Sequence, residues 1–170
     1  YSVDVRDEAA FGTIIEEIYR EHGRLDGVIH GAGVIEDKLV EDKTIDSFDR
    51  VFSTKVDGAF VLTRKLQPDA LKFLVFFSSI AGRFGNKGQS DYAAANEVLN
   101  KLAAYLDASW PARVLAINWN PWADVGMAGA EALRQFENSG IVPIKPPAGS
   151  DMFDREITAG PKGQPEVVIG

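Results

Sequence analysis

Two hydrophobic periodicities alternate along this chain. Residues 6–22 carry apolar side chains at three- and four-residue spacing with acidic residues between them, which predicts an amphipathic helix that Gly23 ends. The same spacing recurs further along, the first time after a capping sequence at 44–46. These later helices are expected over residues 47–66, 91–108, 129–138 and 149–159.

Short apolar runs separate the helices and predict strands. The run at 72–79 is continuous rather than alternating, so we expect a central strand that is covered on both faces. Residues 1–7 also have strand-like composition, and a loop with three glycines is expected over 82–90. The other strands are expected at 25–30, 113–119 and 166–169. This order requires crossover helices between parallel strands, which indicates a doubly wound α/β sheet in one domain.

Composition narrows the function classes. The 170 residues hold 18 Lys and Arg against 25 Asp and Glu, a net charge of −7, which argues against nonspecific nucleic-acid binding. There is no cysteine, so disulfides and thiolate chemistry are excluded and a reducing compartment such as the cytoplasm is expected. The longest apolar run, 73–77, is far below the roughly 20 residues of a membrane span. The chain starts without Met or a signal peptide, which suggests a piece of a longer protein.

Unusual residues follow three of the predicted strands, at 31–33, 78–79 and 118–122. In open parallel sheets, ligands bind beyond the carboxyl ends of the strands, so these segments mark the candidate site. Ser78 and Ser79 also have a purely structural interpretation, because hydroxyl groups satisfy backbone groups at strand ends.

Three further residues favour chemistry at this edge. Tyr92 stands at the entrance to the next helix, with Asn96 one turn further on the same face, and the glycine loop can fold that helix start back over the strand end near Ser79. Lys55 lies in an apolar helix, where a buried ammonium is costly without a polar partner; the alternative is that it reaches the surface.

A phenol, an ammonium, a hydroxyl and an amide suit hydride transfer to a carbonyl. The Tyr92 phenol gives a proton to the developing alkoxide if a nearby cation lowers its pKa from about 10. The Ser79 hydroxyl donates a hydrogen bond to the same oxygen. Asn96 orders a water or holds Lys55 for a proton relay.

The spacing of Ser79, Tyr92 and Asn96, with Tyr-Ala-Ala-Ala-Asn at 92–96, resembles the short-chain dehydrogenase/reductase family. More narrowly it is similar to the ketoreductase domain of polyketide synthases and polyunsaturated fatty-acid synthases. Lys55 far upstream, with Asn four after Tyr, is the polyketide-type arrangement, whereas ordinary members put Lys at that position. The segments that carry the resemblance are 27–34, 55–59, 77–82, 88–96 and 118–122.

The resemblance implies a Rossmann-like fold and a role for each motif. Tyr92 is then the general acid, Ser79 polarises the ketone, and Lys55 and Asn96 complete the tetrad. NADPH is the implied cofactor and no metal is expected. The residues implied to hold the cofactor are Asp4 and Val5 at the adenine, Gly31, Ala32 and Gly33 at the ribose, and Pro121 and Trp122 at the nicotinamide. The glycines as a plain loop closure and Trp122 as a core residue are the alternatives.

Two features concern product and substrate. The stereochemical marker of the family is represented by Ile35-Glu36-Asp37, and Phe84 stands where the opposite stereotype has Trp, which implies a (3R) alcohol; a solvated acidic loop is the alternative. Asn120 replaces the usual Gly and is expected to crowd the nicotinamide end or alter the turn. The Gly- and Pro-rich excursion at 123–148 is expected to be a substrate lid.

The Gly-rich phosphate loop of a complete domain does not occur in these residues. We therefore expect the C-terminal portion of a ketoreductase domain, incomplete at its N-terminus, which binds dinucleotide poorly alone and whose open sheet edge favours dimerisation or pairing with the missing part. The implied substrate is a 3-ketoacyl thioester on an acyl carrier protein, beside other synthase domains. The alternatives are a free-standing reductase of soluble ketones and a non-reducing, epimerising or structural subdomain.

Overall fold

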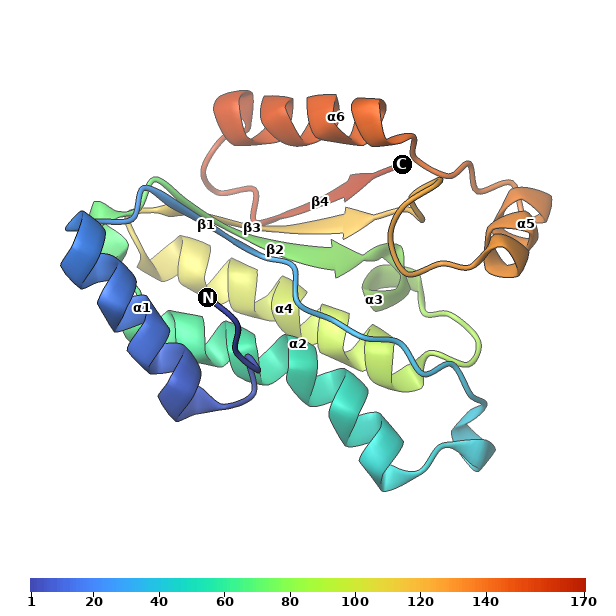
Figure 1. Cartoon of the computed structure of the whole chain (residues 1–170). Coiled ribbons are helices and arrows are strands. Elements are labelled where there is room, and N and C mark those ends of the chain that lie inside the picture. Colours follow the sequence, from blue (N-terminus) through green and yellow to red (C-terminus); the bar gives the residue numbers. More distant parts are fainter.

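A sheet of four parallel strands in the order β1-β2-β3-β4 forms the centre of the structure (Figure 1). The structure is a computed structural model that describes the backbone of residues 1–170 and all side chains except that of Ala130. The strands are β1 (Gly27–His30), β2 (Phe73–Ser79), β3 (Arg113–Trp119) and β4 (Glu166–Ile169). This arrangement confirms the predicted parallel α/β architecture.

Helices cover both faces of the sheet (Figure 1). One face carries α1 (Glu8–His22), α2 (Ile45–Lys65) and α4 (Ser90–Ser109), and the other carries α6 (Pro146–Ala159). The short α3 (Ile80–Phe84) and α5 (Ala130–Asn138) lie beyond the carboxyl ends of the strands. Two 3-10 turns, η1 (Val40–Asp42) and η2 (Pro68–Ala70), flank α2. Within the described part of the chain, no helix is both long and apolar enough to cross a bilayer.

The central strand β2 is buried on both faces, as its unbroken apolar run predicts. Leu74 and Phe76 pack into the cluster beneath α1, α2 and α4. Val75 lies in the second cluster on the opposite face, where Phe77 packs beside it. Successive residues of a strand point to opposite faces, so an apolar residue at every position gives the sheet two apolar faces.

The helix starts are set by side-chain caps. The Asp7 carboxylate accepts a hydrogen bond from the Ala10 amide at 3.0 Å, and the Thr44 hydroxyl accepts one from the Ser47 amide at 3.2 Å. Each cap satisfies an amide that lacks a partner within the helix. The predicted starts of α1 and α2 are thereby confirmed to within two residues.

Three expectations about the elements are wrong. Residues 1–7 form a turn, closed by a hydrogen bond from the Asp7 amide to the Asp4 carbonyl at 3.0 Å, and no described strand pairs with them. The glycine loop is entered through α3, because Ser79 caps a short helix there. Helix α6 starts at Pro146 rather than 149, because proline suits the first helical turn.

Candidate active site

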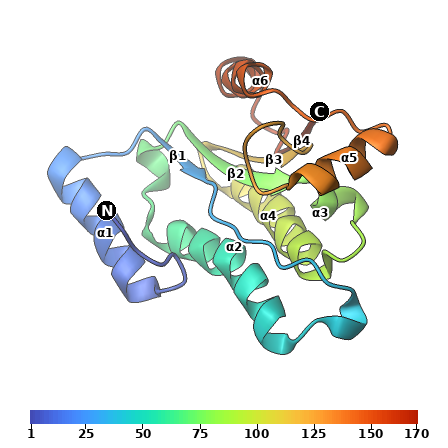
Figure 2. The ribbon, with the colours of Figure 1, turned by 45° about the vertical axis from the view of Figure 1, so that its right-hand side comes forward.

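The carboxyl ends of the strands bring together the three segments singled out from the sequence. Ser79 ends β2 and is in register with Trp119 at the end of β3, while Gly31 directly follows β1. Figure 2 shows α3, the start of α4 and α5 gathered at this end of the sheet. The fold therefore gathers the three segments at one edge of the sheet.

Three polar side chains meet around Tyr92, in the first turn of α4. The Tyr92 side chain is buried, and the side chains of Ser79 and Asn96 lie near enough to its phenol to lower its pKa. The side-chain Nδ2 of Asn96 donates to the backbone carbonyl of Tyr92 at 2.7 Å. The Lys55 ammonium lies 5.3 Å from the centroid of the Tyr92 ring. Residues from α2, β2 and α4 thus converge on one phenol.

Ser79 fits both interpretations given from the sequence: it satisfies a backbone group at the end of a strand, and its side chain lies at the candidate site. Its hydroxyl oxygen accepts a hydrogen bond from the Ala81 amide at 3.2 Å, so it caps α3. Because that contact uses a lone pair, the hydroxyl hydrogen remains able to donate. Ser78 is buried instead, and donates to Asn118 Oδ1 at 3.1 Å, which makes it a core residue.

Lys55 is buried and does not reach the surface, so the surface alternative is wrong. Its side chain is on the inner face of α2, with only 2% of the residue exposed, and its ammonium donates to the Phe77 carbonyl at 3.0 Å. Burial lowers the pKa of Lys55 from 10.5 to about 8, because desolvation disfavours the charged form. Gly33 leaves room for this side chain: a Cβ there would lie 3.0 Å from Lys55 Cε.

The pKa of Tyr92 moves against the expectation from the sequence. Burial raises it above 10.0, and hydrogen bonds with Asn96 and Ser79 oppose that rise. The phenol therefore keeps its proton at neutral pH in this structure.

Asn96 contributes one polar atom without a partner. The residue is fully buried, and its Oδ1 accepts no hydrogen bond from the described residues. A buried amide oxygen of this kind costs free energy unless a donor reaches it. It is therefore an atom at this site that a water or a ligand would satisfy.

The residues implied to hold a dinucleotide fall into two groups. Val5 packs against α2 beside Gly58. A Cβ atom placed on Gly58 would lie 3.1 Å from Val5 Cβ and also 3.1 Å from Cε1 of His30, at the end of β1. Asp4 beside it is exposed and paired with Arg6 at 2.6 Å, which lowers the pKa of Asp4 to about 2.

The glycine turn and the Pro-Trp segment differ in their surroundings. A Cβ at Gly31 would meet only Phe77 Cδ2, at 3.8 Å, so the turn leaves open space. Trp122 packs instead in the cluster below α6, with its ring 4.9 Å from that of Trp119. A Cβ at Gly149 would lie 2.3 Å from Trp122 Cη2. The core interpretation therefore describes the Trp122 side chain.

The excursion after β3 is a loop closed at its base. The Ile144 amide donates to the Pro121 carbonyl, and the Ala123 amide donates to the Ile144 carbonyl, each at 2.8 Å. Between these contacts the chain carries α5 and exposes Val125, Met127 and Val142. Figure 2 shows this segment beyond the ends of β2 and β3.

The acidic loop at 35–37 is ordered by its own partners. Glu36 accepts hydrogen bonds from Arg50 at 2.7 Å and from Ser47 at 2.7 Å, which lower the pKa of Glu36 to about 2. Asp37 accepts from Gln89 at 3.0 Å. Because Asp37 is exposed and the Glu36 side chain is 29% exposed, the loop is solvated as well as hydrogen-bonded, and the stereochemical assignment stays a prediction. Phe84, by contrast, is 74% exposed.

The side chain of Asn120 lies against the end of β4. A Cβ at Gly170 would meet Asn120 Nδ2, and the Asn120 amide donates to the Ile169 carbonyl at 2.9 Å. The residue is therefore fixed on the β4 side of the turn that follows β3.

Sequence reasoning missed two residues at this site. His30 is buried, and its Nε2 lies 2.8 Å from the Lys55 carbonyl, which ties the end of β1 to α2. A histidine that ends an apolar strand is the available sequence signal. Asp91 is also buried, and its partner is Lys43, which is distant in the sequence.

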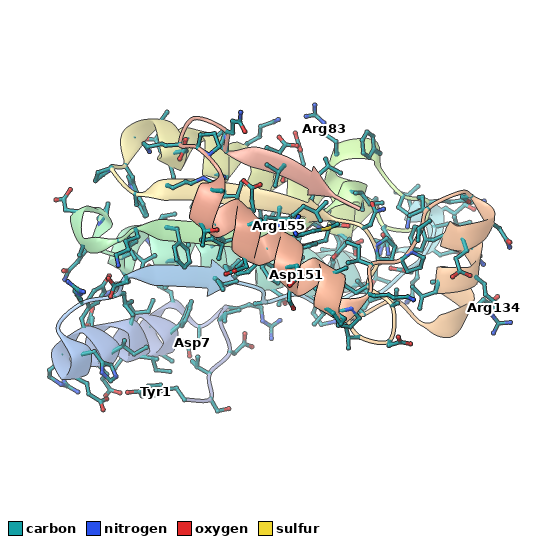
Figure 3. All side chains as sticks on the ribbon, turned by 90° about the horizontal axis from the view of Figure 1, so that it is seen from above. Tyr1, Asp7, Arg83, Arg134, Asp151 and Arg155 are labelled. Carbon is teal, nitrogen blue, oxygen red and sulfur yellow. The ribbon has the colours of Figure 1, made fainter. Side chains whose placement is uncertain are left out.

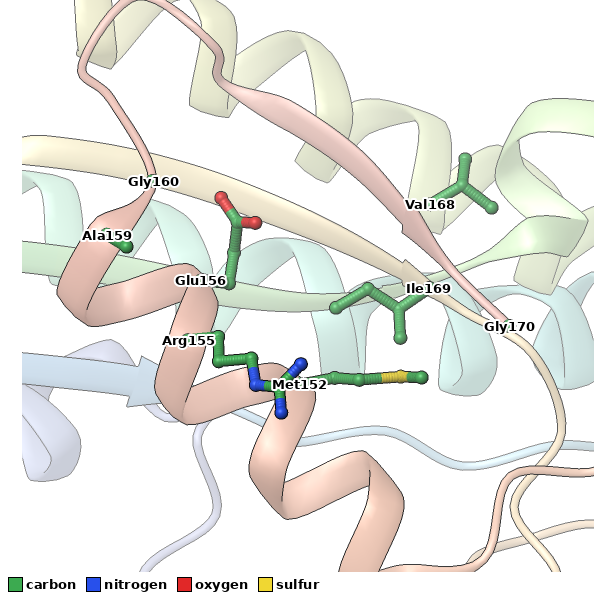
Figure 4. Close-up of a pocket in the computed structure, with 8 residues that line it drawn as sticks. All are labelled: Met152, Arg155, Glu156, Ala159, Gly160, Val168, Ile169 and Gly170. Carbon is green, nitrogen blue, oxygen red and sulfur yellow. The ribbon is translucent and has the colours of Figure 1, made fainter.

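A shallow pocket lies away from these residues. It has a volume of about 440 Å³ between α6 and the end of β4, and its lining includes Met152, Arg155 and Val168 (Figure 4). Figure 3 shows Arg155 and Asp151 on α6 above the sheet. Neither Tyr92 nor the three side chains around it line this pocket, so it is separate from the candidate site.

Comparison with known proteins identifies the class. A sequence profile of the KR domain matches residues 1–124, and the chain belongs to this family of short-chain dehydrogenase/reductase-type oxidoreductases, which use nicotinamide cofactors. The resemblance to ketoreductase domains inferred from the sequence is thereby confirmed.

Individual relatives are consistent with membership of this family. The chain is 38% identical over 170 residues to a polyunsaturated fatty acid synthase protein of Thraustochytrium sp., covering 99% of this chain and 6% of that protein. It is 38% identical over 161 residues to spectinabilin polyketide synthase system protein NorB of Streptomyces orinoci, covering 92% of this chain and 7% of that protein. A crystal structure of a ketoreductase domain from the bacillaene assembly line is 36% identical with a TM-score of 0.88, covering 99% of this chain and 41% of that one. The chain thus spans less than a tenth of the length of the two synthase proteins that it matches.

Proposed function

We propose that this chain is the C-terminal portion of a ketoreductase catalytic domain, with a substrate lid over 123–148, and that the domain reduces a 3-ketoacyl thioester on an acyl carrier protein with NADPH. The observation that carries the proposal is the convergence of Ser79, Asn96 and Lys55 on Tyr92. A phenol, a hydroxyl, an amide and an ammonium suit proton delivery to a carbonyl as it is reduced.

The end of β1 fits a nicotinamide cofactor. Gly31 leaves open space, and Gly33 faces Lys55 closely enough that a side chain would displace it. Asn96 Oδ1 adds a buried acceptor without a partner. We assign Gly31, Ala32 and Gly33 to the ribose side and Asp4 and Val5 to the adenine. The backbone of Pro121 and Trp122 is assigned to the nicotinamide side, because the Trp122 ring packs in the core. When bound, the nicotinamide supplies the hydride.

The proton comes from Tyr92 Oη. Burial keeps the phenol protonated at neutral pH, so it is ready to donate to the carbonyl oxygen as negative charge grows there. The Ser79 hydroxyl donates a hydrogen bond to the same oxygen, because its cap contact with Ala81 leaves its hydrogen available.

Lys55 and Asn96 serve the phenolate that remains after proton transfer. An ammonium over the ring face stabilises negative charge on Tyr92, and the low dielectric of the buried site strengthens that attraction. Asn96 Oδ1 accepts a hydrogen bond from a water that relays a proton from bulk solvent to the phenolate.

The substrate is assigned from the family and from the loop after β3. That loop is closed at its base and exposes Val125, Met127 and Val142, which suit contact with an acyl chain. Relatives that are large synthases support a carrier-bound substrate and neighbouring domains as partners.

The experiment is reduction by the complete domain that contains this chain. A 3-ketoacyl thioester on an acyl carrier protein and the matching free ketoacid are each incubated with NADPH or NADH, and the 3-hydroxy product is measured by mass spectrometry. The proposal expects NADPH-dependent reduction of the carrier-bound substrate. Absence of the 3-hydroxy product, or equal rates of reduction of the carrier-bound substrate and the free ketoacid, would contradict the proposal.

A further inference from the structure

A buried ion pair lies directly behind the proposed general acid. Lys43 Nζ and Asp91 Oδ2 are 2.6 Å apart, and the two side chains are 3% and 2% exposed. Lys43 follows η1 and precedes the capping residue of α2, whereas Asp91 is in the first turn of α4. The pair therefore joins the start of the helix that carries Lys55 to the start of the helix that carries Tyr92.

The second carboxylate oxygen of Asp91 holds the Tyr92 backbone. The Tyr92 amide donates to Asp91 Oδ1 at 2.8 Å. Amides in the first turn of a helix have no partner within the helix, and the capping position of α4, Gln89, supplies no side-chain hydrogen bond. Asp91 thus satisfies an amide of the residue whose phenol must reach the substrate.

Lys43 also fixes the neighbouring loop. Its ammonium donates to the Glu36 carbonyl at 2.8 Å, and the Lys38 amide donates to the Gly88 carbonyl at 2.9 Å. The acidic loop at 35–37 and the segment that leads into α4 are consequently held side by side. Movement of either segment would shift the first turn of α4.

We propose that Asp91, neutralised by Lys43, is a positioning residue that holds Tyr92 in reach of Ser79 and Lys55. Burying two charges costs desolvation free energy that an apolar pair avoids, so the pair is poorly explained by stability alone. A fixed first turn suits a proton donor, because a small misplacement of a catalytic group lowers the rate steeply. The inference rests on the proposed role of Tyr92.

The test compares two double variants in the complete domain, assayed on the carrier-bound substrate. Lys43→Met/Asp91→Asn removes both charges but keeps an acceptor for the Tyr92 amide, whereas Lys43→Met/Asp91→Ala removes that acceptor as well. We expect the first to keep kcat within about 3-fold of the wild type and the second to lose about 10-fold or more. NADPH affinity and melting temperature are expected to be alike in both variants.

Equal kcat in the two double variants would overturn the inference. The control is Lys101→Met, which breaks the exposed Lys101–Glu97 pair at 2.8 Å on the same helix and should leave kcat unchanged. If the variants do not fold, hydrogen exchange at the Tyr92 amide of the wild type decides: protection supports the bond to Asp91, and exchange at the rate of an unbonded amide overturns it. Failure of the proposed function would appear separately, as a wild type that does not reduce or a Tyr92→Phe variant that does.

Discussion

The ammonium of Lys55 lies 5.3 Å from the centroid of the Tyr92 ring, in a site where neither residue is more than 9% exposed. The buried charge has no carboxylate partner among the described residues, and its hydrogen bond goes to the Phe77 carbonyl at 3.0 Å. An arrangement of this kind lowers stability, and the proposed function gives it a purpose, since the same charge stabilises a phenolate.

Lys55→Met should stabilise the fold and abolish reduction. The pKa of Lys55 falls from 10.5 to about 8 on folding, which corresponds to about 3 kcal/mol lost from folding at pH 7. Replacement by Met removes that cost but also the bond to Phe77, so we expect a net gain of about 1–2 kcal/mol in the free energy of unfolding. Reduction should fall about 100-fold or more.

The pH dependence of unfolding tests whether the buried Lys55 charge lowers the stability of the fold. Because the unfolded chain binds the Lys55 proton more tightly, wild-type stability should rise between pH 8 and 10.5 as the folded lysine is deprotonated. Denaturant titrations of the Lys55→Met variant should lack this rise. A variant that is less stable than the wild type at pH 7 would contradict the account.

His30→Gln should reduce the loss of stability in acid. Burial lowers the pKa of His30 from 6.5 to about 4, so the folded state resists protonation that the unfolded state accepts. Wild-type stability from this group is complete above pH 6.5 and falls by about 3 kcal/mol as the pH drops to 4. Glutamine keeps a donor for the Lys55 carbonyl but does not titrate. Identical acid profiles for the two proteins would show that His30 is not the cause.

Gly149→Ala should loosen the packing of Trp122. A Cβ at 149 would lie 2.3 Å from Trp122 Cη2, so the indole must move, at a cost of about 1–3 kcal/mol. The matched control is Gly31→Ala, where a Cβ would meet only Phe77 Cδ2, at 3.8 Å, and a change below about 0.5 kcal/mol is expected. Thermal unfolding of both variants measures the difference, and equal melting temperatures would refute the packing.

The isolated chain should bind NADPH poorly, because its sequence contains no Gly-rich phosphate loop. Calorimetric titration of the 170-residue chain measures this directly, and tight binding would contradict the division of the domain. The expected dimerisation through the sheet edge stays a prediction that sedimentation of the same sample would test. In the structure β1 is an outer strand of the sheet.

Much of the fold follows from local pattern. The unbroken apolar run at 73–77 was sufficient to predict a strand buried on both faces, and Thr44 was sufficient to predict the start of α2. The sequence predictions fail where pairing with a neighbouring strand decides whether a segment becomes a strand. Residues 1–7 have strand composition but no described neighbour to pair with, so they form a turn.

The site was predictable in residue types and not in electrostatics. Spacing placed Tyr92, Ser79 and Asn96 together, whereas the depth of burial reversed the expected direction of the Tyr92 pKa shift. Asp91 was not identified because its role depends on Lys43, 48 positions away in sequence. Such a contact is a property of the folded chain and has no local signal.

The central claim is that the Tyr92 phenol delivers the proton to the reduced carbonyl, and removal of one oxygen atom tests it most directly. The measurement is the rate of 3-hydroxyacyl formation by the complete domain carrying Tyr92→Phe, beside Tyr105→Phe, which changes a tyrosine on the same helix that is 69% exposed. The account predicts that Tyr92→Phe loses activity about 100-fold or more with its fold and NADPH affinity intact, and that Tyr105→Phe behaves as the wild type. Undiminished reduction by Tyr92→Phe would contradict it.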